Sequence, residues 1–264
     1  MNKKIIFLKS FIIIFLFINV TIFSKTISLA TINFEPYYGQ KLKNGGAVAE
    51  LIKKVFNEEG YNVKIKYVPW ARAVGYLDMG VVDGIYAMWK TESRDKKYLL
   101  SEPFFPNEIV FVSMKKNSIK FDGDYKKLKK YRIGGVRGYS YLETMKKYKY
   151  NFDLTSTDIL NVKKLLYGRV DLIIGDKLET QYIIKKYFKE FYGKEEYLKP
   201  IVTMENQYLA FSKKVKDAKL KLEAFNRGLK KLKENGEYEK IKEEILQLSK
   251  FINEKREEKI EVKK

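Results

Sequence analysis

The residue types that can do chemistry in this chain are carboxylates, lysine, arginine, tyrosine, serine and threonine, because its 264 residues include no histidine and no cysteine. The missing histidine excludes a Ser-His-Asp triad, an imidazole base and a histidine-ligated metal. The missing cysteine excludes disulfides, a thiol nucleophile, cysteine-ligated zinc and iron–sulfur clusters. We therefore expect no metal and no cofactor, and the remaining side chains favour binding over catalysis.

Several of these side chains are placed where a small ligand can be held. Asp176 comes just after a predicted buried strand at 171–175, and ligands of open α/β sheets bind beyond the carboxyl ends of strands. The turn at 138–140 opens a helix, so it can offer backbone N–H donors and the Ser140 hydroxyl to an anion. Aromatic side chains that can enclose a ligand or cover a cation are Phe34, Tyr37, Trp70 and Trp89.

Most of these residues also have a purely structural interpretation. Asp176 and Ser140 suit the N-cap position of a helix. Phe34 and Tyr37 can pack within their own loop, and Trp70, which starts a helix, can belong to the core. These alternatives stay open at the level of the sequence.

The arginines and the two Gly-x-x-Asp motifs are equally ambiguous. Arg94 lies in a charged run and by itself is typical of a surface residue, and Arg72 can face either a cleft or solvent. Asp83 and Asp171 each follow a glycine by three residues, which indicates structural turn chemistry rather than ligand contact.

Alternating strands and helices must position these residues. Apolar and alternating runs predict strands at 27–31, 63–68, 82–88 and 108–114, with helices at 47–59 and 71–79. After a polar stretch at 115–124 the pattern begins afresh. Strands are then predicted at 131–136, 152–154, 171–175, 198–203 and 207–211, with helices at 139–148, 157–167, 177–188, 215–234 and 238–248. The restart predicts two α/β units rather than one continuous sheet.

The charge and the two ends of the chain complete the pattern. With 53 basic and 33 acidic residues the net charge is +20, but the lysines are scattered, so we expect a solvated basic surface and no nucleic-acid partner.

Residues 1–24 resemble a cleavable secretory signal peptide, since Lys3 and Lys4 precede an apolar run at 11–23. The alternative is an uncleaved membrane anchor. Residues 249–264 are nearly all charged and are predicted to form a flexible tail.

Ordered motifs give the chain a family resemblance over about residues 27–246. In the first unit they are Asn33-Phe34-Glu35-Pro36-Tyr37-Tyr38, Trp70-Ala71-Arg72-Ala73, Gly80-Val81-Val82-Asp83-Gly84, Thr91-Glu92-Ser93-Arg94 and Ser101-Glu102-Pro103-Phe104-Phe105. In the second unit and at the end they are Ile133-Gly134-Gly135-Val136-Arg137-Gly138-Tyr139-Ser140, Gly168-Arg169-Val170-Asp171 followed by Asp176, and Glu234-Asn235-Gly236-Glu237-Tyr238-Glu239-Lys240-Ile241. In this order they resemble the family-three extracellular solute-binding proteins, the receptors of polar amino-acid ABC transporters.

The resemblance implies an α/β, two-lobed periplasmic binding protein type II fold. Each lobe is expected to be a mixed sheet flanked by helices, and two crossing strands join the lobes. Lobe 1 is expected to comprise residues 25–112 plus 208–248, and lobe 2 residues 113–207. The implied function is a monomeric periplasmic receptor, not an enzyme. It captures a small polar ligand, such as an amino acid, in the cleft and delivers it to an ABC transporter permease in the inner membrane.

The resemblance also implies the site residues. Arg94 matches the arginine that binds the ligand carboxylate in this family, and Asp176 matches the aspartate that binds the ammonium group. The rest of the predicted ligand-binding set is Phe34, Tyr37, Trp70, Arg72, Trp89, Thr91, Gly138, Tyr139 and Ser140.

The chain departs from the family pattern just ahead of Arg94. Polar amino-acid receptors carry Gly-x-Thr-x-Thr there, whereas here only Thr91 remains of that motif. Lys90, Arg72 and Arg94 together would suit a ligand with more than one negative charge. Two alternatives to transport are a ligand-sensing role for a membrane signalling partner and a cleft dehydratase, for which Asp176 and Glu35 are the candidate acid or base.

Overall fold

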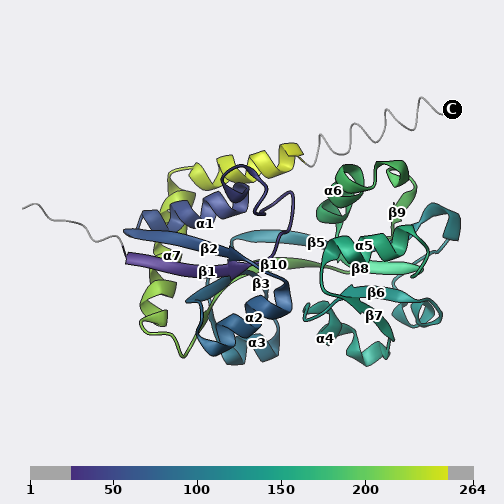
Figure 1. Ribbon diagram of the computed structural model, residues 1–264, viewed down its shortest axis with the longest axis horizontal. Coiled ribbons are helices and arrows are strands. Elements are labelled where there is room, and N and C mark those ends of the chain that lie inside the picture. Colours follow the sequence, from purple (N-terminus) through teal and green to yellow (C-terminus); the bar gives the residue numbers. More distant parts are fainter. Residues whose placement is uncertain (1–24, 249–264) are drawn as a thin grey trace, which may run out of the picture.

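The computed structural model describes residues 25–248. The signal peptide predicted at 1–24 and the tail predicted at 249–264 lie outside these residues. Figure 1 shows the described chain as two lobes side by side, with strands β5 (Phe105–Met114) and β10 (Thr203–Ser212) running from one lobe to the other. Between residues 25 and 248, no helix has both the length and the apolar character needed to cross a membrane.

The first lobe is built on three strands of one sheet. Its elements are β1 (Lys25–Thr31), α1 (Ala47–Asn57), β2 (Tyr61–Tyr67), α2 (Trp70–Met79), β3 (Gly84–Trp89), α3 (Glu92–Lys97), β4 (Tyr98–Leu100), α7 (Ala218–Glu234) and a last helix at 237–248. Strand β1 pairs in parallel with β2 and β3, so all three end at the same edge of the sheet. Helix α1 buries Val48, Leu51, Ile52 and Val55, as expected for an apolar stripe at helical spacing.

The second lobe repeats this plan with shorter elements. They are β6 (Ile133–Val136), α4 (Tyr141–Met145), β7 (Phe152–Thr155), α5 (Asp158–Leu166), β8 (Leu172–Asp176), α6 (Lys177–Tyr187) and β9 (Glu195–Tyr197). Strand β6 lies in parallel between β7 and β8. Short 3₁₀ turns complete the chain at Lys43–Gly45, Lys115–Asn117, Tyr125–Lys130, Lys146–Tyr148 and Lys189–Phe191.

The crossing strands pair with each other as well as with both lobes. Strand β5 runs antiparallel to β10 from Phe105↔Gln207 to Ile109↔Thr203, while β10 also pairs with β3 and β5 with β8. The two predicted lobes are confirmed. The expectation that they would not share a continuous sheet is wrong, because this pairing gives one path of order β2-β1-β3-β10-β5-β8-β6-β7. The predicted lobe boundaries, 112/113 and 207/208, fall inside β5 and β10.

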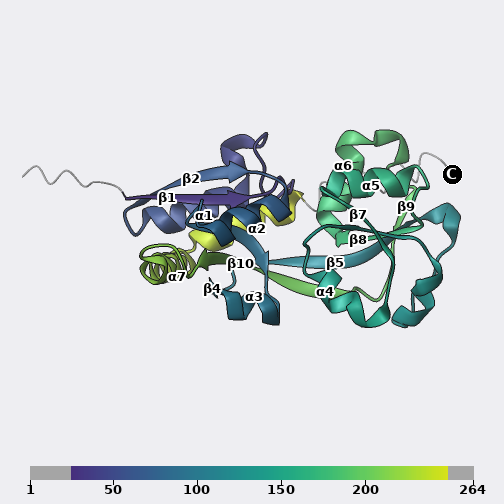
Figure 2. The same ribbon diagram turned by 60° about the horizontal axis from the view of Figure 1, so that its bottom comes forward.

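The two lobes contact each other through aromatic side chains. Trp70 at the start of α2 and Trp89 at the end of β3 both pack against Tyr139 of the second lobe, with ring centroids 6.3 and 5.4 Å apart. The Trp70 indole N–H also donates to the carbonyl oxygen of Gly138 at 3.0 Å. In Figure 2, α2 accordingly lies on the side of the first lobe that faces the second. The structure is therefore an arrangement with the lobes in contact.

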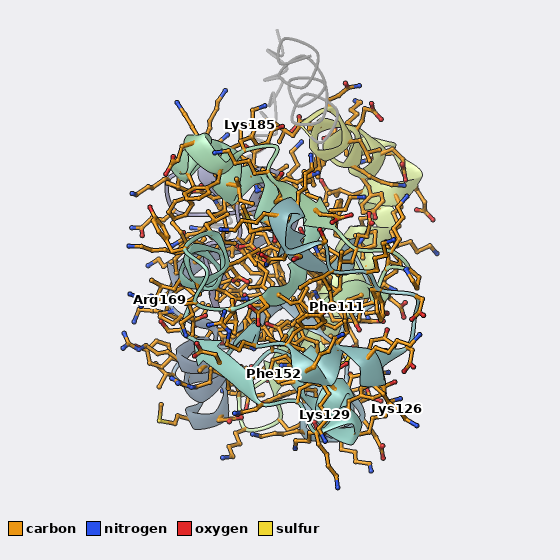
Figure 3. The ribbon with its side chains drawn as sticks, turned by 90° about the vertical axis from the view of Figure 1, so that its right-hand side faces the viewer. Phe111, Lys126, Lys129, Phe152, Arg169 and Lys185 are labelled. Atoms are coloured by element: carbon orange, nitrogen blue, oxygen red, sulfur yellow. The ribbon has the colours of Figure 1, made fainter. Side chains whose placement is uncertain are left out.

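The basic surface expected from the composition is visible on the second lobe. Lys126, Lys129 and Arg169 are exposed and lie at the outer surface of that lobe in Figure 3, whereas Phe111 is buried. Water and salt screen charges in such positions, so the surplus of lysine is compatible with a stable fold.

Candidate ligand-binding site

A cavity of about 310 Å³ lies between the two lobes. The segments that follow β1, β2 and β7 supply much of its wall, so it lies beyond the carboxyl ends of strands in both lobes. This is where open α/β sheets bind ligands, and the volume is within the range of small-molecule pockets. From the first lobe it is lined by Ile32, Asn33, Glu35, Gln40, Lys41, Tyr67, Val68, Pro69 and Trp70, and from the second by Tyr139, Ser156, Thr157, Asp158, Ile159, Glu179, Ile183 and Tyr187.

A second space of about 20 Å³ adjoins this cavity, since Ile32, Trp70 and Tyr139 line both. Its other lining residues are Phe34, Tyr38, Ala87, Trp89, Arg94 and Ser140. Ser140 is 4 % exposed, and among the described residues its hydroxyl has no hydrogen-bond partner. The residue stands at the N-cap position of α4 without making a capping bond. A buried unpaired hydroxyl costs about 1–3 kcal/mol, so it is an open position for a polar group of a ligand.

Arg94 connects the two lobes. One terminal nitrogen of its guanidinium donates to the carbonyl oxygen of Trp89 and the other to that of Gly138, both at 2.7 Å. The guanidinium also lies 5.6 Å from the ring centre of Trp70, within the range of a cation–π contact. Burial lowers the pKa of Arg94 from its ordinary value. Gly138 has φ +81°, in the left-handed region that favours glycine, and this conformation presents its carbonyl to Arg94 and Trp70.

Asp176 is fully buried and makes contacts to both lobes. It caps α6 by accepting from the backbone N–H of Glu179 at 2.7 Å, which confirms the N-cap interpretation. It also accepts from the Asn107 amide at 3.0 Å and from the Tyr37 hydroxyl at 3.0 Å. Burial raises the pKa of Asp176 to about 7, although these donors act in the opposite direction. Contact of Asp176 with a ligand stays a prediction.

Two further buried carboxyl groups face the larger cavity, Asp158 at the start of α5 and Glu179 in the first turn of α6. Their carboxyl groups lie within hydrogen-bonding reach of each other, and the Tyr139 hydroxyl donates to Asp158. Burial raises the pKa of Asp158 to about 6 and that of Glu179 well above its ordinary value. Within residues 25–248, no lysine or arginine forms an ion pair with either carboxyl. The cavity therefore contains acidic groups that have no cationic partner on the described part of the chain.

A third carboxylate at this cavity, that of Glu35, has a cationic partner. Glu35 of the first lobe accepts from the Lys186 ammonium at 2.8 Å and from the Tyr187 hydroxyl at 2.9 Å, both on α6 of the second lobe. This ion pair closes one side of the cleft.

The structure places most of the predicted site residues at the cleft. Phe34, Trp70, Trp89, Arg94, Tyr139 and Ser140 line one or both spaces, and Gly138 and Tyr37 bond to groups of the opposite lobe. Two predicted residues lie elsewhere. Thr91 caps α3 by accepting from the backbone N–H of Arg94, and Arg72 is exposed on α2 and lines neither space.

The predicted cluster of three cations is not formed. Lys90 pairs with Asp95 at 3.0 Å, Arg72 is exposed, and Arg94 bonds to backbone carbonyls. The expectation of a ligand with more than one negative charge therefore loses its basis, because these three cations do not converge.

The sequence pattern did not identify Asp158 and Glu179 as site residues. An acidic residue in the first turn of a helix is already explained by its interaction with the helix dipole. The sequence feature that could have identified them is their shared position, because each lies in the first turn of a helix that directly follows a strand of the second lobe. Parallel strands place such helix starts at one edge of a sheet.

The buried carboxyls of Asp158 and Asp176 predict how the stability of the fold depends on pH, and this prediction does not involve the ligand. Because the chain has no histidine, buried carboxyls are the side chains expected to titrate between pH 5 and 8. The raised pKa values of Asp158 and Asp176, about 6 and about 7, mean that the folded protein binds more protons than the unfolded chain above pH ~4. The free energy of unfolding then falls as pH rises from about 4 to 7.

We expect the ligand-free protein to melt at least about 5 °C higher at pH 5 than at pH 8, as measured by circular dichroism. Asp176→Asn should reduce the difference, since the amide keeps the capping position without titrating. A melting temperature that is equal or higher at pH 8 would contradict these assignments.

With this geometry, the chain can be compared with known proteins. Residues 28–247 match the bacterial extracellular solute-binding proteins, family 3. The chain belongs to this family. The resemblance inferred from the ordered motifs is thus confirmed.

Individual relatives agree with the family assignment. An arginine-binding periplasmic protein of Mannheimia haemolytica is 32% identical over 166 residues, which cover 60% of this chain and 62% of that protein. An ancestral arginine-binding protein bound to glutamine is similar in structure, with a TM-score of 0.71 and 25% identity over 83% of this chain and 96% of the other. A histidine kinase sensor domain with similarity to periplasmic binding proteins has a TM-score of 0.73 and 20% identity, over 83% and 95% of the two chains. This chain shares the two-lobed α/β periplasmic binding protein fold with the two solved structures.

Proposed function

We propose that this family-three solute-binding protein is a periplasmic receptor that binds a small cationic ligand between its lobes and delivers it to an ABC transporter permease. The observation that carries the proposal is the acidity of the interlobe cavity. Asp158 and Glu179 line it while almost completely buried, and no cation of the described chain pairs with them. Burial of a charged group without a partner is costly, so a cationic ligand would supply what the cavity lacks.

The volume and lining of the cavity fit an amino acid with a basic side chain. Trp70, Tyr67 and Tyr139 line the same cavity, and aromatic rings attract ammonium and guanidinium groups. The ligand's cation would lie near the two carboxyls, and its polar head near Ser140 and Arg94 in the adjoining space. The description of the curated relative as arginine-binding supports this choice.

The location and the partner follow from the family. A receptor of this kind works outside the cytoplasm, and we propose that the protein is exported, monomeric and engaged by a permease of the inner membrane. The ligand would be enclosed by both lobes, as in other two-lobed binding proteins that close about a hinge.

A thermal-shift experiment tests the ligand class. The mature chain would be melted with L-arginine and L-lysine, and with L-glutamate and L-leucine as controls of opposite and no side-chain charge. A ligand at 100 times its Kd stabilises the folded state by about 2.7 kcal/mol, or roughly 5–10 °C for a chain of this size. We expect this shift with a basic amino acid only. Stabilisation by glutamate alone, or by none of the four, would contradict the proposal.

Delivery to a transporter is tested separately. The ligand-loaded receptor should stimulate ATP hydrolysis by its permease–ATPase complex in proteoliposomes, and the ligand-free receptor should do so much less. Ligand binding without such stimulation, but with activation of a membrane-bound kinase, would favour the sensing role.

A further inference from the structure

Asp158 and Glu179 are buried carboxyls of one cavity that lie within hydrogen-bonding reach of each other, an arrangement that favours a proton between them. An ionised carboxylate only accepts hydrogen bonds, so one of two carboxyls that bond to each other must be protonated. The Tyr139 hydroxyl stabilises an ionised Asp158, whereas Glu179 is more deeply buried and close to the negative charges of Asp158, Asp176 and Glu35, so we place the proton on Glu179. Two ionised carboxylates in such contact would repel each other strongly, and both residues are almost fully buried, at 8 % and 3 % exposure.

The groups around the pair do not supply a counter-charge. From the first lobe the ionisable groups that face it or act on it are Glu35, Tyr37, Tyr38, Lys41 and Tyr67. From the second lobe they are Tyr139, Tyr141, Asp176, Lys186 and Tyr187. The ammonium of Lys186 is paired with Glu35, and Lys41 is exposed at the rim. Burial raises the pKa values of Tyr139 and Tyr141, so these phenols stay neutral.

An independent observation points to a ligand at the same cleft. The buried Ser140 hydroxyl lines the adjoining space and has no partner within the described part of the chain. Tyr139 connects the two positions, since its hydroxyl bonds to Asp158 while its ring lines both spaces. The carboxyl pair and an open hydrogen-bonding position therefore lie in adjoining spaces that share Tyr139.

We propose that Asp158 and Glu179 form the subsite for a primary-amine or guanidine cation, and that the cation enters in exchange for the proton that the empty pair shares. This inference rests on the proposed function, because it concerns the same cavity. On binding, the O–H bond of Glu179 breaks and the proton leaves to the solvent. The carboxylates then accept hydrogen bonds from the N–H groups of the cation, and Tyr139 continues to donate to Asp158.

The exchange does not require a carboxylate on the ligand. Both terminal nitrogens of Arg94 already bond to the backbone carbonyls of Trp89 and Gly138, so they are engaged by the protein itself. Agmatine, which is arginine without its carboxylate, should therefore also bind and release a proton.

Isothermal titration at pH 7 in phosphate and in HEPES measures the exchange, because the two buffers differ in ionisation enthalpy and neither contains a primary amine. The probes are L-arginine and agmatine. We expect release of about one proton for each bound ligand, and an affinity that rises between pH 5 and 8. Since the chain has no histidine, no imidazole can be the source of this proton.

Isosteric variants locate the source. Glu179→Gln and Asp158→Asn should each reduce proton release to near zero and lower the affinity at least about tenfold, a loss of about 1.4 kcal/mol. Glu196→Gln is the matched control, because Glu196 is exposed on β9 and lies outside the cavity. It should retain the parental affinity and proton release. Melting curves confirm that each variant is folded, and if one fails to fold, the other still tests the pair.

The outcomes separate this inference from the proposed function. If the probes bind to the parent without proton release, or if both isosteric variants bind as the parent does, the exchange is wrong while the receptor function stands. If proton release is lost in Asp176→Asn but retained in Glu179→Gln, the proton belongs to Asp176 and the assignment is overturned. If neither probe binds, both proposals fail.

Discussion

Arg94→Ala is expected to weaken ligand binding by roughly thirty-fold to a thousand-fold, or about 2–4 kcal/mol. Arg94 donates to Trp89 within its own lobe and to Gly138 of the other lobe, and its guanidinium stacks on Trp70. The bond to Gly138 exists only when the lobes are in contact, so the substitution removes a charge-assisted link that stabilises the closed form. Hydrogen bonds to charged groups are worth about 1.5–3 kcal/mol each.

Isothermal titration of the purified variants measures this effect. Arg72→Ala is the matched control, because it removes the same charge from an exposed position on α2 and should change the affinity less than about twofold. Arg94→Lys should remain impaired, since an ammonium cannot span two carbonyls as a planar guanidinium does. Parental affinity in Arg94→Ala would show that the interlobe link contributes nothing to binding.

The same variants distinguish two roles of Arg94. If it acts only by holding the lobes together, Arg94→Ala should weaken the binding of L-arginine and of agmatine by equal factors. If it also contacts the ligand carboxylate, as the family resemblance implies, the loss should be larger for L-arginine.

Gly228→Ala is expected to destabilise the fold by roughly 1–3 kcal/mol or more. Gly228 lies in α7 where that helix packs on α1, and a Cβ atom there would stand 2.1 Å from the carbonyl oxygen of Val55. The obstacle is backbone inside a helix, so the two helices would have to move apart and lose buried contacts.

Urea unfolding monitored by circular dichroism measures the change in the free energy of unfolding. Gly75→Ala is the matched control, because Gly75 lies within α2 and nothing stands within 4 Å of its missing Cβ. That substitution should be neutral or stabilising by up to about 1 kcal/mol, from helix propensity alone. Equal stability of the two variants would mean that α1 and α7 do not approach as closely as described.

Residues in repeated local motifs could be assigned a structural role from the sequence, although their partners, 39 and 55 positions away, could not be identified. Asp83 accepts from the backbone N–H and the hydroxyl of Ser28 at 2.7 and 2.8 Å, and Asp171 pairs with Arg132 at 2.8 Å. Both were predicted to be structural, and this is confirmed. Asp176 was predicted at a strand end next to a helix start, and it occupies that position as the N-cap of α6.

The sequence by itself determined the family, the two-lobed fold and most of the aromatic lining of the cleft. These follow from ordered motifs, apolar periodicity and turn residues, which act over a few positions of the chain. Only the tertiary structure decided which charges the cavity presents. Arg72 and Arg94 have the same side chain, and both belong to motifs of the first unit. In the structure, however, Arg72 faces solvent, whereas Arg94 bonds to the other lobe. Asp158 and Glu179 are ordinary first-turn acids of separate helices. They become a proton-sharing pair because parallel β7 and β8 on either side of β6 bring the two helix starts to one buried edge, where no lysine or arginine of the described chain forms an ion pair with them.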